Sequence, residues 1–430
     1  MAEHIDLQTE LNQKISVSSH NLQSKYKLLN HLDRVLEWEK NGLTYPILVN
    51  FTLTNSCSHR CPLCTSRDFL DKRTVSFEEA KDIILQLKEV GVKAIGLGGG
   101  GDPTCHPHLK EVIEFIGQNG MEVSLTTNGQ LLTDGIIEAV VKNGTWIRVS
   151  LDADGPQLFK RMHGMEEEVF HLVVGNIAKL VEARKFFTSD VVIGVTYLIG
   201  AHTVEGVYNA AALAKKLGVD YIRIRPFFTW DDAKKEKVEK ENVENPEAEN
   251  VEKANAQIVQ MNIPASISKR DGIQRVFPPK SVREPKSEEI LRELQRCKEL
   301  EDERFSVSYP VDRFQTIRGE NQRVHKMCYV HHFTTVISAD AKLYPCCMLE
   351  DNAKYCLGNL KEKSFKEIWH SDERKQAYSK INFKDCPNPC MLEKHNELLW
   401  AIKHGESSEE ISLKEVLYAV KVPQAHANFL

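Results

Sequence analysis

Three cysteines near the start of the chain have the spacing of a metal-binding loop. Cys57, Cys61 and Cys64 form the pattern C-x3-C-x2-C directly after an apolar, strand-like run over residues 46–53. Three soft thiolates this close in sequence can converge on one metal, because the loop is too short to hold them apart. On a four-iron cluster, three protein ligands leave one iron open for another molecule. A zinc site with a fourth ligand, for which His59 is available, is the alternative.

A second group of cysteines lies in the last third of the chain. Six of the eleven cysteines fall between residues 328 and 390. Residues 338–346 are typical of a hairpin, which would bring Cys346 beside Cys328, and Cys386 and Cys390 follow forty residues later. This clustering favours a second metal site over scattered core thiols.

Composition excludes several classes of protein. The chain has 430 residues, of which 41% are hydrophobic and 27% charged, and its formal net charge is −5. That charge gives no basic field for nucleic acid, and no apolar run is long enough to span a membrane. The N-terminus lacks the pattern of a secretory signal. We therefore expect a cytoplasmic protein, in which cysteines serve as metal ligands before disulfides.

Strands and helices alternate over residues 46–226. Strand-like runs lie at 47–53, 94–97, 122–126, 146–151, 191–198 and 221–224, and amphipathic helices at 77–90, 109–119, 134–142, 170–186 and 204–217. Six β/α units predict a parallel sheet that closes partway into a (β/α)6 barrel. Sites in such barrels form at the carboxyl ends of the strands, so motifs that follow strands should share one face.

Glycine and short polar side chains follow these strands. Four glycines after the second strand would let the backbone approach a ligand without a Cβ in the way. The residues at these strand ends are Gly98, Gly99, Gly100, Gly101, Asp102, Thr127, Asn128, Ser150, Asp152 and Arg225. Asn128 is also suited to helix capping, Arg225 to an ordinary salt bridge, and Cys105 is expected to be a buried thiol without a role.

The cysteine loop, followed one β/α unit later by the glycine loop, resembles the signature of the radical S-adenosylmethionine (SAM) enzymes. The resemblance implies that Cys57, Cys61 and Cys64 hold a [4Fe–4S] cluster whose open iron binds SAM. Residues 98–102 match the Gly-Gly-Glu loop, whose backbone binds the SAM amino group, with Asp102 in place of the commoner Glu. Thr127, Asn128, Ser150 and Asp152 match positions around the ribose and methionine parts of SAM, whereas Arg225 is a candidate because a guanidinium that faces the barrel interior would need a carboxylate of SAM or of the substrate.

The second cysteine group resembles the auxiliary-cluster extension called SPASM or twitch. The shared features are the hairpin, the segment 357–360, the helix 365–369 and the closing cysteines. The resemblance implies one auxiliary [4Fe–4S] cluster held by Cys328, Cys346, Cys386 and Cys390. Structural zinc at the same thiols is the alternative, and Cys347 and Cys356 stay unassigned.

The resemblance also implies an activity. Reductive cleavage of SAM would give a 5′-deoxyadenosyl radical that takes a hydrogen atom from the substrate, with electrons from a partner such as flavodoxin or ferredoxin. The single auxiliary cluster and the lack of a peptide-recognition domain in residues 1–45 favour oxidation, dehydration or epimerisation of a small polyol or aminocyclitol. A ribosomal-peptide maturase and a non-catalytic iron–sulfur or zinc binding module are the alternatives.

The sequence predicts five segments. They are a helical leader at 1–45, the barrel at 46–230, a charged insertion or lid at 231–305, the auxiliary cluster domain at 306–395 and C-terminal helices at 396–430. Helical pieces are expected near 247–262 and 286–303 within the insertion, and at 397–404 and 413–420 near the end.

Overall fold

The computed structural model describes residues 25–62, 64, 66, 70–200, 203–226, 287–309, 323, 325–383, 386, 390–405, 426 and 428–429. Within these residues ten strands form one sheet in the order β10-β9-β8-β1-β2-β3-β4-β5-β6-β7. Every neighbouring pair from β8 to β7 is parallel, and only the β8–β9 and β9–β10 pairs are antiparallel. The predicted partial parallel barrel is therefore confirmed.

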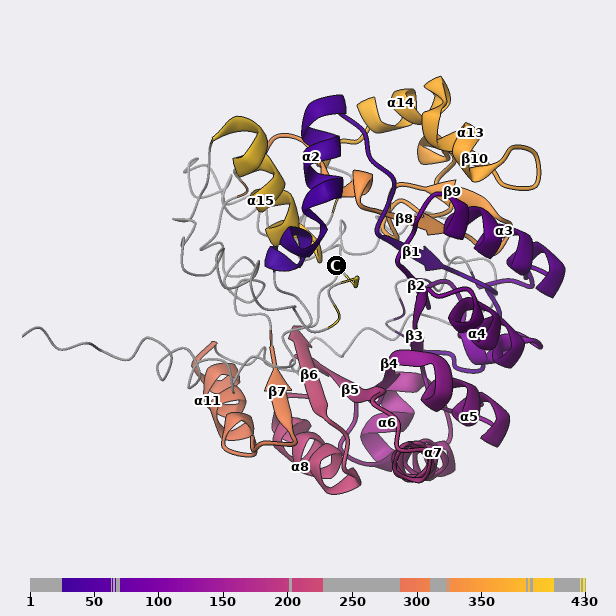
Figure 1. The fold of residues 1–430 in the computed structure, drawn as a ribbon. Coiled ribbons are helices and arrows are strands. Elements are labelled where there is room, and N and C mark those ends of the chain that lie inside the picture. Colours follow the sequence, from indigo (N-terminus) through magenta and orange to yellow (C-terminus); the bar gives the residue numbers. More distant parts are fainter. Residues whose placement is uncertain are drawn as a thin grey trace, which may run out of the picture.

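The barrel strands carry many buried β-branched side chains. The strands curve around a common interior (Figure 1). Their bounds are β1 (Leu48–Phe51), β2 (Ala94–Leu97), β3 (Glu122–Thr127), β4 (Gly144–Ser150), β5 (Val192–Ile199), β6 (Tyr221–Pro226) and β7 (Ser306–Ser308). The six strands expected from the sequence all form. The seventh, β7, pairs with β6, so residues 306–308 extend the barrel sheet and do not begin the auxiliary domain.

Amphipathic helices cover the outer face of the barrel (Figure 1). They are α3 (Phe77–Glu89), α4 (Leu109–Gln118), α5 (Asp134–Asn143), α6 (Pro156–His163), α7 (Glu167–Phe186), the short η4 (Val204–Gly206) with α8 (Val207–Leu217), and α11 (Ser287–Lys298). A further 3-10 turn, η3 (Pro103–Cys105), precedes α4. The helix α6 was not predicted. The piece expected at 286–303 forms as α11, whereas 247–262 and 413–420 lie outside the described residues.

The C-terminal module is built onto the edge of the barrel sheet. It contains η6 (Val330–His332), β8 (Thr334–Ile337), β9 (Lys342–Tyr344), η7 (Ala353–Tyr355), β10 (Gly358–Asn359), α13 (Phe365–His370), α14 (Asp372–Ser379) and α15 (Glu393–His404). The predicted hairpin forms between β8 and β9, with Ala341 in its turn at a φ of 63°. Because β8 pairs with β1 from Leu48 to Phe51, one hydrogen-bonded sheet joins module and barrel.

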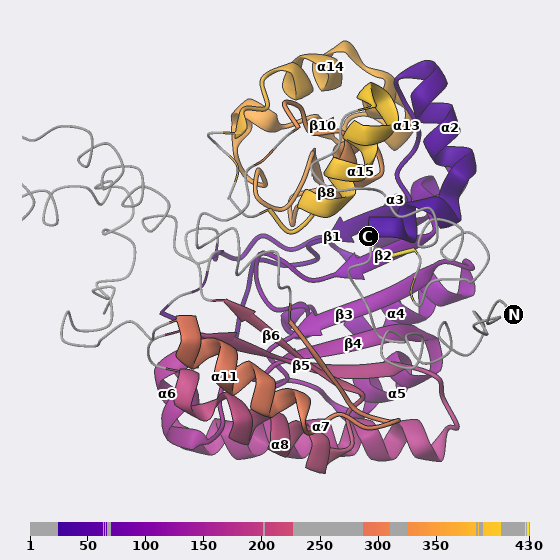
Figure 2. The same cartoon turned by 90° about the vertical axis from the view of Figure 1, so that its left-hand side faces the viewer.

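The N-terminal helices pack against this module. In Figure 2, α2 (Leu32–Asn41) and the preceding η1 (Lys25–His31) lie beside α15. Trp38 is buried against the rings of Tyr329 and Phe333, at centroid distances of 5.1 and 5.7 Å. The indole of Trp369 donates a hydrogen bond to the Thr44 carbonyl at 2.8 Å. The leader therefore fixes the module to the barrel.

A buried lysine lies at the amino ends of the strands. The Lys27 ammonium donates to the Phe429 carbonyl at 2.9 Å, and the Phe429 ring packs on Trp146 at 5.5 Å. Burial, with Arg223 nearby, lowers the pKa of Lys27 to about 7. Phe429 also packs with Leu48 and Ala94, the first residues of β1 and β2. This end of the barrel is thus covered by protein, which leaves the carboxyl ends of the strands for ligands.

None of the helices in the described part of the chain combines the length and the apolar composition that a bilayer span requires.

Candidate active site

The cysteine loop leaves β1 and is held by a returning segment. The Asn55 amide donates to the Arg73 carbonyl, and the Val75 amide donates to the Leu53 carbonyl, both at 2.9 Å. The Thr54 and Thr74 hydroxyls are 2.8 Å apart. These bonds close the loop at its base, so that the cysteines it carries lie at the carboxyl end of the sheet.

The three loop thiols are half-buried and close enough to influence one another. Burial raises the pKa of Cys57 to about 12, and the charges of Asp102 and Cys64 add to the rise. Burial also raises the pKa of Cys61, with further contributions from Cys64 and Cys57. The thiolates therefore need a cation to form here. A metal centre held by these thiols would supply it, and three converging thiolates suit an iron–sulfur cluster.

The glycine loop after β2 packs directly on the cysteine loop. The Gly101 amide donates to the Thr54 carbonyl at 3.1 Å, and the Asp102 amide donates to the Ser56 carbonyl at 2.8 Å. A Cβ on Gly101 would lie 2.0 Å from the Ser56 carbonyl oxygen. The backbone of the cysteine loop, more than a ligand, thus requires glycine at this position.

Asp102 directs its carboxylate into the protein. It accepts hydrogen bonds from the Thr104 amide at 2.9 Å, from the Thr127 hydroxyl at 2.9 and 3.0 Å to its two oxygens, and from the Asn128 amide at 2.6 Å. The Asn128 side-chain amide in turn lies 3.1 Å from the Ser58 hydroxyl and 3.8 Å from the Cys57 sulfur. Asp102, Thr127, Asn128 and Cys57 are therefore brought together, as one network that orients the cysteine loop.

This network makes the stability of the chain sensitive to Asp102. We expect Asp102→Asn to lower the free energy of unfolding by about 2 to 4 kcal/mol, because an amide nitrogen cannot accept from the donors now paired with the carboxylate. Urea unfolding followed by circular dichroism measures the loss. Asp134→Asn, at a side chain that is 89% exposed, is the control and should change stability by less than about 0.5 kcal/mol. Equal stability of the two variants would contradict the role given to Asp102.

Further predicted residues lie at the ends of β4 and β6. Asp152 has a φ of 46°. Its backbone amide donates a hydrogen bond to the Thr196 carbonyl at 3.0 Å, and its carboxylate accepts one from the Thr196 hydroxyl at 3.2 Å. Ser150 is the last residue of β4 and pairs with Thr196. Arg225 lies on β6 opposite Leu198, half-buried. These residues share the strand-end face with the cysteine loop, as the sequence predicts.

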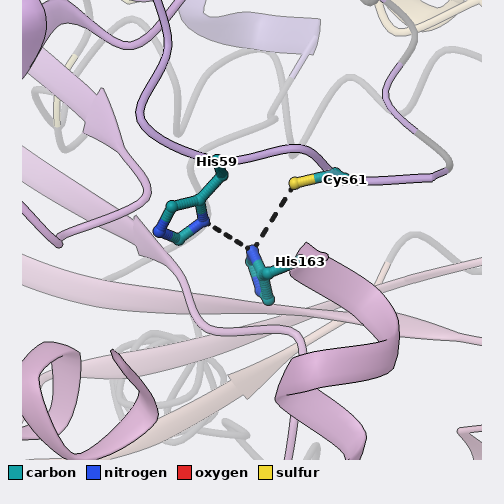
Figure 3. Close-up of side chains that lie close together, drawn as sticks. All are labelled: His59, Cys61 and His163. Atoms are coloured by element: carbon teal, nitrogen blue, oxygen red, sulfur yellow. Dashed lines mark hydrogen bonds between the residues drawn. The ribbon is translucent and has the colours of Figure 1, made fainter. Parts of the chain in front are cut away.

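A histidine that the sequence did not indicate contacts the loop. His163, at the end of α6, donates from Nε2 to the Leu151 carbonyl at 3.0 Å, which leaves Nδ1 of the neutral ring as an acceptor. That Nδ1 lies 3.1 Å from the His59 Nδ1 and 3.7 Å from the Cys61 sulfur (Figure 3). Burial lowers the pKa of His163 and lowers that of His59 to about 3, so both rings are neutral.

His59, Cys61 and His163 form the one group of described residues with the geometry of a mixed histidine–cysteine metal site. Its three ligand atoms all lie within 4.8 Å of one another. The zinc alternative of the sequence thus has a structural counterpart, although the His59 Nδ1 faces His163 and not an open position on the loop.

The second cysteine group also converges. Burial raises the pKa of Cys328, and the neighbouring Cys390 and Cys386 add to the rise. Burial likewise raises the pKa of Cys346 well above its usual value, with additions from Cys347, Cys328 and Cys390. The four thiols predicted to bind the auxiliary metal therefore lie together. Cys347 is a fifth neighbour, which the sequence left unassigned.

The other two cysteines of interest have different surroundings. The Cys356 sulfur lies 3.7 Å from the Gly358 carbonyl, beside the short β10 strand. Cys105 lies near Ser58 and Asp102, and burial raises its pKa. It is half-buried, whereas the sequence suggested a buried thiol without a role.

An arginine joins the auxiliary module to the cysteine loop. The Arg73 guanidinium donates two hydrogen bonds to Asp351, at 2.9 and 2.5 Å, and a third to Asp71 at 2.7 Å. Asp340, in the β8–β9 turn, is 3.5 Å away. Because the Arg73 carbonyl also anchors Asn55, the ion pair couples the position of the module to the base of the loop that carries Cys57.

Comparison with known proteins identifies the family. The model of the radical SAM superfamily matches residues 51–200, and the model of the SPASM iron–sulfur cluster-binding domain matches residues 328–392. The chain belongs to the radical SAM superfamily. The radical SAM domain binds a [4Fe–4S] cluster and SAM, and the SPASM domain binds auxiliary iron–sulfur clusters. The predictions of a [4Fe–4S] cluster, of SAM and of auxiliary iron–sulfur binding are confirmed, and the chain is an enzyme of this family.

Relatives of this radical SAM enzyme match different shares of the chain. Mycofactocin maturase MftC of Mycolicibacterium smegmatis is 28% identical over 207 residues, which cover 46% of this chain and 51% of the relative. AdoMet-dependent heme synthase of Methanosarcina barkeri is 24% identical over 331 residues, or 76% of this chain and 83% of the relative. The chain spans about half the length of the maturase that it matches.

A solved structure shares the fold. The crystal structure of Streptococcus suis SuiB bound to S-adenosylmethionine aligns with 88% of this radical SAM chain and 79% of its own, with a TM-score of 0.53 and 14% identity. At that identity the likeness concerns the fold alone. It agrees with the barrel and the appended SPASM domain described above.

Proposed function

We propose that this radical SAM enzyme abstracts a hydrogen atom from a peptide and thereby modifies it. In this proposal Cys57, Cys61 and Cys64 hold the SAM-binding cluster. The auxiliary cluster is held by Cys328, Cys346, Cys386 and Cys390. The observation that carries the proposal is the placement of the first loop at the carboxyl end of the sheet, tied by Arg73 to the domain that holds the second thiol group.

The chain's own residues prepare the site. Asp102 and Asn128 fix the loop, and the Asn128 amide supports the Cys57 sulfur. The glycine loop presents backbone groups to the SAM amino group, while Arg225 is suited to a carboxylate. With the cofactors bound, the site supplies one-electron cleavage of the SAM sulfonium, which yields methionine and a 5′-deoxyadenosyl radical. The SPASM domain covers the β1 side and helps to keep water away.

A peptide substrate is favoured by the comparisons, against the first expectation from the sequence. The first relative named above is a maturase, and SuiB, which shares the fold, has also been solved bound to its precursor peptide SuiA. A small polyol remains the second candidate. It rests on the resemblance of the second cysteine group, whose four predicted ligands are enough for a single auxiliary cluster.

A cluster held by Cys328, Cys346, Cys386 and Cys390 would supply a one-electron acceptor for the substrate radical. We infer that this acceptor would suit a net two-electron oxidation of either substrate. A reducing partner such as flavodoxin or ferredoxin would deliver the electron that starts each turnover.

The substrate class can be tested by isotope transfer. The enzyme is reconstituted anaerobically with iron and sulfide and supplied with SAM and reductant, together with deuterated candidate peptides or deuterated polyols. Mass spectrometry of 5′-deoxyadenosine should show deuterium only with the correct class. Transfer from polyols and not from peptides would replace the first candidate with the second. Absence of 5′-deoxyadenosine with both clusters intact would contradict a catalytic function.

A further inference from the structure

The distances among His59, Cys61 and His163 are close to those of a tetrahedral zinc site. The Nδ1 atoms of the two rings are 3.1 Å apart, and the His163 Nδ1 is 3.7 Å from the Cys61 sulfur (Figure 3). Zinc bonds are about 2.0 to 2.1 Å to nitrogen and about 2.3 Å to sulfur, which would place these pairs about 3.3 and 3.6 Å apart. The side chains therefore need little movement to share one ion.

The surroundings of His163 direct a lone pair to this position. Its Nε2 donates to the Leu151 carbonyl at 3.0 Å, so the Nδ1 of the neutral ring carries no proton. The ring is buried and stacks on Phe159 at a centroid distance of 4.1 Å. Phe159 also meets the His59 ring edge-on at 5.7 Å, which fixes both rings. A histidine that binds a metal usually has this arrangement, with its second nitrogen donating to a carbonyl or carboxylate.

The surroundings of His59 favour the same tautomer. The Gln130 side chain interacts with the His59 ring. The His59 Nε2 and the Gln130 Oε1 are buried, and neither has a further hydrogen-bond partner among the described residues. The Gln130 backbone is held by Asn128 Oδ1 at 2.9 Å and by the Asn176 side chain at 3.1 Å. A proton on the His59 Nε2 would pair both buried atoms, which are costly to leave unpaired.

The two tautomers together leave a gap in charge between the rings. With both Nε2 atoms protonated, two Nδ1 lone pairs and the Cys61 sulfur face one another. Without a metal, an Nδ1–H on His59 can bridge the rings, but the His59 Nε2 and Gln130 Oε1 then stay unpaired. A metal ion between the Nδ1 atoms satisfies every one of these groups. Two neutral imidazoles and one thiolate are the donors that zinc prefers among the common divalent cations.

We propose that His59, Cys61 and His163 bind zinc in the chain that has not yet received its first cluster. The Cys61 thiol gives its proton to solvent, and the rings bind through Nδ1 while their Nε2–H groups donate to Gln130 and Leu151. Because the Cys61 thiolate serves either metal, assembly of the first cluster displaces the zinc. The site is independent of the proposed peptide substrate, and only the displacement rests on the cluster role proposed for Cys61.

Zinc binding to the cluster-free full chain tests the site. The chain is stripped of metal anaerobically, loaded with zinc, desalted, and analysed for zinc content and by zinc X-ray absorption. The wild type should hold one more zinc per chain than His163→Phe or His59→Phe, and it alone should show two imidazole ligands beside sulfur. The thiols predicted for the auxiliary site would contribute sulfur, so the imidazole signal reports on this site. His108→Gln, at a side chain that is 52% exposed, is the control and should match the wild type.

A fourth variant keeps all three ligands. Gln130→Leu removes only the acceptor for the His59 Nε2–H, and it should weaken zinc binding about 10- to 100-fold in competition with a chelator. Circular dichroism verifies the fold of each variant. If a histidine variant does not fold, the wild-type absorption spectrum and the Gln130→Leu affinity decide.

Three results would overturn the proposal, each at a different step. Zinc bound through sulfur alone, or equal zinc content in the wild type and both histidine variants, would refute the site. Unchanged affinity in Gln130→Leu would refute the tautomer given to His59. Imidazole-bound zinc that persists after the first cluster is reconstituted would refute the displacement. By contrast, an enzyme that forms no 5′-deoxyadenosine with both clusters intact would refute the proposed function and leave the zinc site standing.

Discussion

Cys61→Ser will abolish the formation of 5′-deoxyadenosine and lower the iron content from about eight to about four per chain. The reason is the loss of one of the three ligands of the cluster. Cys61 lies between the other two thiols in sequence, and its sulfur is held by the loop whose base is fixed at Asn55 and Val75. A serine oxygen is a harder and less acidic ligand than a thiol sulfur, so it does not replace thiolate on iron. With two ligands left, the cluster that binds SAM is lost.

Three measurements check this expectation. Iron and sulfide are counted after anaerobic reconstitution, product is assayed by mass spectrometry, and unfolding is followed to show that the fold persists. Cys297→Ala is the control, since Cys297 is buried in the core on α11 and belongs to neither thiol group. It should keep the full iron content. Product formation by Cys61→Ser would mean that SAM is cleaved elsewhere, and an unchanged iron count would assign the cluster to other ligands.

The barrel was predictable because each of its signals is local. Apolar runs of strand length alternate with amphipathic stretches, and glycine ends several helices, as at Gly218 with a φ of 79°. These features follow from backbone sterics and burial, which act over a few residues. The six strands and the strand-end face that carries the cysteine and glycine loops could therefore be predicted before any contact was known.

The missed features have two different causes. The helix α6 is only eight residues long, and its signals, Pro156 at its start and Gly164 at its end, are weak beside the longer helices. Its contact between His163 and Cys61 was missed with it. Arg73 contributes through an ion pair with Asp351, a residue far from it in the sequence. That contact depends on β8 pairing with β1, and no local pattern specifies which strand edge β8 will take.

For Asp102 the structure confirms the predicted position but gives the side chain a different role. Its position was predicted within a ligand-binding loop, and the structure gives its side chain a structural task that the motif does not reveal. The motif describes the backbone path, whereas the hydrogen-bond partners of the carboxylate come from η3 and β3. A family pattern can thus place a residue correctly while leaving the role of its side chain to be determined.

Gly101→Ala will separate the glycine loop from the cysteine loop, with the largest loss of stability that we expect from any single methyl group in this chain. The added Cβ would lie 2.0 Å from the Ser56 carbonyl oxygen and 2.5 Å from the Asn55 carbonyl carbon. Both are backbone atoms, so no side chain can rotate away. Relief requires the loops to part, which breaks the bonds of the Gly101 and Asp102 amides to Thr54 and Ser56.

We expect this change to cost about 3 to 5 kcal/mol, from overpacking together with two lost hydrogen bonds. The effect is read as a lower urea midpoint and as poor reconstitution of the first cluster, while the SPASM cluster still forms. Gly175→Ala is the matched control, because nothing lies within 4 Å of its Cβ and Gly175 is inside α7. An alanine there should stabilise the helix by up to about 1 kcal/mol. If Gly101→Ala instead kept wild-type stability and the full iron content, the two loops would not be packed as the structure has them. The role of this backbone contact in positioning Cys57 would then be wrong.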